Sequence, residues 1–86
     1  MEVLCRVVKP YYDWDGRKYL ELESRDMGLH FRVKVPFRYG RVMCRAEGLR
    51  TIQEIKQDEI ILAFMEKKFW DGDVHWILHG FREVDP

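Results

Sequence analysis

The chain has 86 residues, of which 47% are hydrophobic and 35% are charged. This length and balance predict one globular domain over residues 1–86 and exclude a disordered or fibrous chain. Fifteen Lys and Arg residues balance fifteen Asp and Glu residues, so the net charge of zero indicates no class of partner.

The sequence carries no sign of a membrane span or a secretory signal. Its longest apolar run, residues 60–65, is far shorter than the roughly 18 residues that a span needs. Arg6 and Lys9 interrupt the apolar N-terminal stretch, which argues against a signal peptide. Cys5 and Cys44 stand among apolar neighbours, so we expect two buried thiols and no disulfide. These features predict an intracellular protein, cytoplasmic or nuclear, that does not contact membranes.

The first half of the chain repeats apolar residues with a period of two, which predicts strands. The predicted strands cover residues 3–9, 17–24, 29–35 and 40–47. Pro10 ends or kinks the first strand, because proline cannot donate to a sheet ladder. Asp15-Gly16 is a strong hairpin signal before the second strand. In the third strand the alternation places Phe31 in the core and Arg32 and Lys34 on the opposite face.

The second half begins with a short helix and ends with a long hairpin. Thr51 and Glu54 match a capping box, which predicts a helix of about two turns that ends near Asp58. Residues 59–70 and 74–83 are predicted strands, joined by the turn Asp71-Gly72-Asp73. The chain is therefore predicted to be mainly β, with one helix before its last two strands.

This order of elements resembles the OB-fold, a five-stranded, partly open barrel with a helix between its third and fourth strands. The resemblance is one of topology and covers nearly the whole chain. It implies a small five- to six-stranded barrel whose second and third strands, at residues 17–45, form a nucleic-acid-binding surface. If residues 29–35 and 40–47 are separate strands, an SH3-like barrel is the alternative fold.

Charge is unevenly distributed along the chain. Residues 25–50 hold seven basic and two acidic side chains, whereas both flanking segments are net acidic. Six of the seven cations are Arg, which binds phosphate with two donors and stacks on flat rings. Aromatic residues interleave with them, as in proteins that bind single-stranded nucleic acid. The predicted nucleic-acid-binding residues are Arg32, Lys34, Arg38, Arg41 and Arg45, which would hold the backbone, and Trp14, Phe37 and Tyr39, which would stack on bases.

No arrangement of residues predicts catalysis, a cofactor or a metal site. His75 and His79 are four residues apart, which on a strand separates them by about 13 Å, too far for one ion. The chain has one Ser and one Thr, and no glycine-rich phosphate loop. We therefore expect a binding module and not an enzyme.

The alternative function is protein interaction, as an adaptor or inhibitor module. Exposed aromatics and open sheet edges would recruit the partner, with Trp70 as an anchor on the last hairpin. The acidic last third and the basic middle of the chain would also suit a homodimer.

Overall fold

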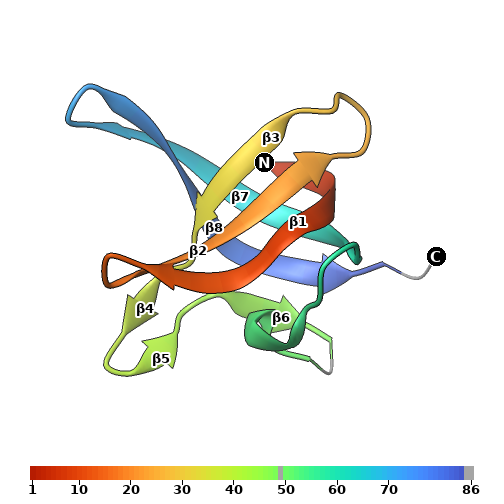
Figure 1. Ribbon diagram of the computed structural model, residues 1–86, viewed down its shortest axis with the longest axis horizontal. Coiled ribbons are helices and arrows are strands. Elements are labelled where there is room, and N and C mark those ends of the chain that lie inside the picture. The colour runs from red at the N-terminus through yellow and green to blue at the C-terminus, as the bar shows by residue number, and fades with distance from the viewer. Residues whose placement is uncertain (49, 85–86) are drawn as a thin grey trace.

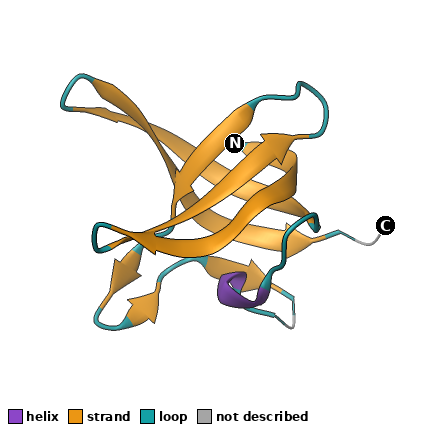
Figure 2. Cartoon of the chain, in the orientation of Figure 1, coloured by secondary structure: helices purple, strands orange, loops and turns teal. Residues whose placement is uncertain are grey.

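The computed structural model describes residues 1–48 and 50–84, which form eight strands and one 3-10 helix (Figures 1 and 2). In chain order these are β1 (Glu2–Trp14), β2 (Arg17–Ser24), β3 (His30–Lys34), β4 (Phe37–Arg38), β5 (Arg41–Val42), β6 (Arg45–Glu47), η1 (Ile52–Glu54), β7 (Ile60–Trp70) and β8 (Asp73–Glu83). Within these residues, no helix has the length and apolar character needed to cross a bilayer.

Five of the strands close into a barrel. β1 pairs antiparallel with β2 and β7, β2 with β3, and β7 with β8. Parallel pairing of Val33 with Trp76 and of Lys34 with Ile77 joins β3 to β8 and completes the ring. β6 is an extra strand that pairs parallel with β8 at Gly80, on the C-terminal side of the position where β3 pairs with β8. The predicted mainly-β fold is thus confirmed, and this strand order is consistent with the OB-like topology.

The barrel interior is built from the apolar positions that the period-two pattern marks. The fully buried side chains come from five strands, from the position just after β3 and from the segment before β7: Cys5, Val7, Leu20, Leu22, Val33, Val35, Ile52, Ile55, Ile61, Met65, Leu78 and Phe81. Phe31 is 6% exposed and packs edge-on against Trp76, with ring centroids 5.0 Å apart. Its predicted place in the core is therefore confirmed.

The predicted helix is shorter than expected. It is a single 3-10 turn, because Ile55 already adopts extended backbone with φ −70° and ψ 133°. The start is as predicted: the Glu54 carboxylate accepts hydrogen bonds from the Thr51 amide at 3.3 Å and the Thr51 hydroxyl at 3.1 Å. Ile52 and Ile55 are both buried in the core, so the turn contributes two apolar side chains to the barrel interior.

Two strand predictions were wrong in extent. β1 continues through Pro10 to Trp14, and irregular pairing between Val7 and Tyr12 absorbs the kink. Residues 40–47 are not one strand: β5 and β6 are separate, and β5 pairs with β4 across a tight turn. Tyr39 and Gly40 both have positive φ, 52° and 75°, as a two-residue hairpin turn requires.

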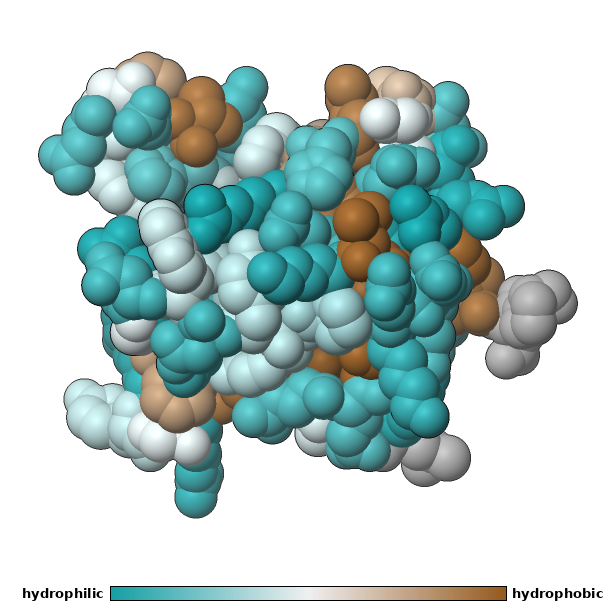
Figure 3. Space-filling model, in the orientation of Figure 1, coloured by the Kyte–Doolittle hydropathy of each residue, from teal (hydrophilic) through white to brown (hydrophobic). Residues whose placement is uncertain are grey.

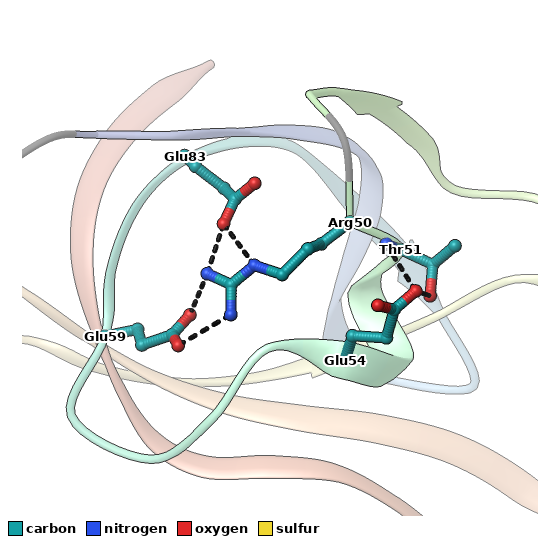
Figure 4. Close-up of polar contacts among 5 residues, drawn as sticks. All are labelled: Arg50, Thr51, Glu54, Glu59 and Glu83. Carbon is teal, nitrogen blue, oxygen red and sulfur yellow. Dashed lines mark hydrogen bonds and ion pairs between the residues drawn. The ribbon is translucent and has the colours of Figure 1, made fainter.

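A three-residue ion network joins the loop after β6 to the residue before β7 and to the end of β8 (Figure 4). The Arg50 guanidinium donates to both carboxylate oxygens of Glu59, at 2.9 and 2.7 Å, and through Nε to Glu83 at 2.6 Å. These bonds, from Glu59 first and then Glu83, raise the pKa of Arg50. The hydrogen bonds from Arg50 outweigh burial and hold the pKa of Glu59 below its usual value.

Candidate functional site

Three hairpin turns lie on one side of the barrel, at the left of Figure 1. They are the Asp15-Gly16 turn of β1–β2, the Tyr39-Gly40 turn of β4–β5 and the Asp71-Gly72 turn of β7–β8. All six residues have positive φ, which matches the right-handed twist of the strands they join. The β7–β8 hairpin projects as an arm beyond the barrel, defined here as residues 66–76. The outer face of β2 and β3 lies between these turns.

An aromatic cluster covers the outer face of β2 and β3 near the first turn, and two cations, Lys9 and Arg32, lie against its rings. Tyr12 is paired with Tyr19 across β1 and β2, with ring centroids 5.8 Å apart, and Trp14 lies 6.2 Å from Tyr19. Arg32 packs against this cluster: its Cζ is 4.3 Å from the Trp14 ring centroid and 4.4 Å from that of Tyr19. Trp14 is 57% exposed. Flat rings and a guanidinium are therefore presented to solvent side by side.

Carboxylates lie on the same face beside the cluster: Glu21 is the cross-strand neighbour of Arg32, and Glu23 is that of His30. Glu21 accepts hydrogen bonds from the Tyr12 hydroxyl at 3.0 Å and pairs with His30 Nε2 at 2.9 Å. Burial alone would raise the pKa of Glu21, but the bonds from His30 and Tyr12 outweigh it and hold that pKa below its usual value. Burial and the bond to Glu21 raise the pKa of Tyr12. Acidic and basic side chains are thus neighbours on this face at Glu21 and Arg32, whereas Lys34, closer to the hairpin turns, has Tyr19 as its cross-strand neighbour.

Two stacked rings on the arm separate two hollows. Trp70 and His75 are parallel, with centroids 3.7 Å apart and planes inclined by 1°. His75 lines the first hollow and Trp70 lines the second, so each ring turns its free face to a different space. Nε2 of His75 is buried without a hydrogen-bond partner among the described residues. Lys34 lines both hollows and places its Nζ 5.9 Å from the Trp70 ring.

The first space, the face hollow, lies between the arm and the outer face of β2 and β3. It is lined by Arg17, Tyr19, Arg32, Lys34, Val74, His75 and Trp76. Three of these side chains are cationic and three are aromatic, and no carboxylate from the described residues is among them. This chemistry suits an anionic chain that carries flat groups.

The second space, the hairpin hollow, lies between the arm and the β4–β5 hairpin. Its rim carries Lys34, Phe37, Arg38, Lys68 and Trp70, and Ile77, only 8% exposed, forms part of its floor. Its volume is about 460 Å³, within the range of sites that take small molecules.

The structure brings some of the predicted binding residues together. Trp14, Arg32 and Lys34 share the outer face of β2 and β3, and Phe37 and Arg38 line the hairpin hollow. The sequence interpretation missed Arg17, Tyr19, Lys68 and His75, which line the same two hollows. The length of the predicted final hairpin is the sequence signal that could have found Lys68 and His75, because a long hairpin extends beyond a small barrel.

The other predicted residues lie elsewhere. Tyr39 is 99% exposed at the tip of the β4–β5 hairpin. Arg41 follows on β5 and lines a separate hollow with Cys44 and Ile52. Arg45 lies on β6, where it pairs with Gly80 of β8.

Neither cysteine has the properties of a nucleophile. Cys5 is fully buried, and burial raises the pKa of its thiol to about 11. Cys44 is half-buried and not fully buried as predicted, and burial raises its pKa to about 12. Both side chains are therefore neutral thiols at pH 7. Among the described residues, no group of three or more His, Cys, Asp or Glu side chains is placed to hold a metal ion.

Comparison with protein-family models, curated proteins and solved structures finds no match for this chain. Its function is therefore inferred from its own geometry and chemistry.

Proposed function

We propose that this protein is a non-catalytic binding module for single-stranded or irregular nucleic acid. The observation that carries the proposal is the Arg32 guanidinium held against the rings of Trp14 and Tyr19, beside Lys34 and open to solvent. A guanidinium stacked on an aromatic ring keeps its donor edge free for phosphate. The neighbouring ring faces offer stacking surfaces that accept any base.

The spacing of the cations favours an extended strand as the ligand. Arg32 and Lys34 are two residues apart on β3, so their backbones are separated by about 6.6 Å. This distance is similar to the phosphate spacing of an extended single strand. Arg17 continues the row on β2, and the arm with His75 forms the opposite wall of the face hollow. Bases unstacked from a partner strand would fit against Trp14 on one wall and His75 on the other.

Fluorescence anisotropy tests the proposal directly. Labelled single-stranded DNA and RNA of matched sequence are titrated with protein at several salt concentrations, with a duplex of the same sequence for comparison. Three to five phosphate contacts predict a log–log slope of the association constant against salt of about −2 to −3.5. We expect salt-dependent binding in the micromolar range or tighter, weaker for the duplex. No binding at low salt would reject the proposal.

The proposal includes the cellular compartment of the protein. Cys5 and Cys44 are both free thiols, which is typical of a reducing environment. We propose an intracellular location, where nucleic acid is accessible.

A second candidate function is protein interaction, and the arm supplies the observation that favours it. Phe69 is 72% exposed and Val74, its cross-strand partner, is 44% exposed, on the face of the arm opposite Trp70. Figure 3 shows this arm carrying an apolar patch within hydrophilic surroundings. β7 pairs with β8 alone beyond Met65 in the described part of the chain, which leaves one edge open.

Phe69 is the stronger anchor for such an adaptor or inhibitor because it is 72% exposed, whereas Trp70, the anchor expected from the sequence, is 36% exposed and stacked on His75. Sedimentation velocity of the wild type and of Phe69→Ser tests the homodimer form of this function. A concentration-dependent dimer that Phe69→Ser abolishes would support it. A monomer at all concentrations would leave only a different protein as the partner, to be sought by pull-down with Phe69→Ser as the control.

A further inference from the structure

We infer that the hairpin hollow is a binding site for one nucleoside phosphate. The hairpin hollow is distinct from the face hollow that covers β2 and β3. The two share Lys34 as a lining residue and are separated by the Trp70–His75 stack. The inference deepens the proposed function, since the nucleotide would be either one unit of a bound strand or a free mononucleotide. Both sources present the same chemistry, a flat ring joined to a phosphate.

The cations of the hollow are placed for the phosphate. Lys34 comes from β3, Arg38 from β4 and Lys68 from β7, so three separate strands direct a positive charge to one space. No described Asp or Glu lines the hollow to neutralise them. None of the three cations forms an ion pair with a described carboxylate, in contrast to Arg50 on the far side of the barrel. Such convergence of unpaired cations costs repulsion unless an anion is bound.

The aromatic and apolar side chains of the hollow are placed for the base. Trp70 is covered by His75 on one face, so its second face is the one available to the hollow. Phe37, 44% exposed, stands on the opposite rim, on the β4–β5 hairpin. Ile77 and Met43 supply apolar surface between the two rings. Base–aromatic stacking is worth about 1–3 kcal/mol per base, which is enough to orient one ring here.

The first test titrates adenosine 5′-monophosphate into the protein and follows the NMR chemical shift of the Trp70 indole N–H. Adenosine and inorganic phosphate are titrated separately for comparison. Arg38→Ala with Lys68→Ala is the test variant, because both side chains are exposed and neither lines the face hollow. Arg25→Ala with Lys56→Ala is the matched control, with the same change in charge on exposed residues that follow β2 and precede β7. We expect the wild-type protein to bind the nucleotide more tightly than it binds adenosine or inorganic phosphate. Nucleotide affinity should fall at least tenfold in the test variant and stay unchanged in the control variant.

The second test separates the two sources of the nucleotide. A labelled single-stranded oligonucleotide is titrated into the same two variants. If the mononucleotide does not bind but the test variant loses at least tenfold in oligonucleotide affinity, the hollow takes one unit of a strand. If the mononucleotide binds and no oligonucleotide does, the hollow is a free-nucleotide site. The inference then stands, and the proposed nucleic-acid function is rejected. If neither ligand responds to the Arg38 and Lys68 substitutions, the inference is overturned, while oligonucleotide binding that depends on Arg32 would leave the proposed function standing.

Discussion

The salt dependence of nucleic-acid binding should fall when two cations are removed from the outer face of β3. Five cations line the two hollows: Arg17, Arg32, Lys34, Arg38 and Lys68. If each contacts one phosphate, the log–log slope of the association constant against salt is about −3.5 for a single strand. The double substitution Arg32→Ala with Lys34→Ala removes two contacts, so we expect a slope of about −2.1.

These slopes translate into affinities that anisotropy separates easily. Between about 50 and about 200 mM salt, the wild-type affinity should fall about 130-fold and that of the double variant about 20-fold. Affinity at low salt should fall as well, because Arg32 also holds the Trp14 and Tyr19 rings in place. Losing its two ring contacts costs about 0.5–1 kcal/mol each at an exposed site, so the variant should remain folded. A melting curve verifies that point before the titration.

The matched control is again Arg25→Ala with Lys56→Ala, which changes net charge by the same amount. Arg25 follows β2 and Lys56 precedes β7, so both are at the ends of these strands away from the hairpin turns. It should keep the wild-type slope, since neither residue lines a hollow. An unchanged slope in the Arg32 and Lys34 variant would refute the assignment of this face. An equal loss in both variants would show that overall charge, and not the site, drives binding.

Three further predictions concern stability. Ile52→Ala should cost about 2–5 kcal/mol in urea unfolding, because its side chain is 1% exposed in the core, while exposed Gln53→Ala should change stability by less than about 0.5 kcal/mol. The pKa of Glu59 is lowered on folding, so its ion pair stabilises the fold above the unfolded pKa near 4.5 and is lost as pH falls through the folded value. Glu59→Gln should therefore lose less stability than wild type as pH falls below about 5 in the same assay. Equal losses of stability at acid pH in the two proteins would contradict this. Gly80→Ala should lower the melting temperature, since the new Cβ would stand 2.9 Å from the carbonyl oxygen of Arg45 and displace β6; an unchanged melting temperature would show that β6 moves freely.

Most of the barrel could be predicted because its strands are defined by local patterns. The alternation of buried Leu20 and Leu22 with polar neighbours fixes the whole of β2, whose predicted bounds are those observed. Asp15-Gly16 and Asp71-Gly72 place two of the hairpin turns, because Asp and Gly tolerate positive φ. The Tyr39-Gly40 turn was missed, since an aromatic residue rarely takes positive φ and gives no such signal.

The sequence predicts which residues of one strand share a face, but not how the strands meet at the candidate site. Arg32 and Lys34 share a face by simple alternation, which the sequence displays. The stack of Trp70 on His75 depends on how β7 and β8 are paired across the arm, and the two hollows depend on β3 closing against β8. Trp70 and His75 are five positions apart across a turn, and the β3–β8 pairs are 43 positions apart. A period-two pattern carries no information on either contact.

The net charge of a chain segment does not predict which of its charged residues come together on the surface of a barrel. Arg50 belongs to the basic middle of the chain but is bound by two carboxylates from its acidic last third. Arg25 and Arg45, from the same basic segment, line neither hollow. Arg17 and Lys68 come from segments that are net acidic, yet both line a hollow. Barrel closure, by placing β2, β3, β7 and β8 around one site, concentrates positive charge there in a chain whose net charge is zero.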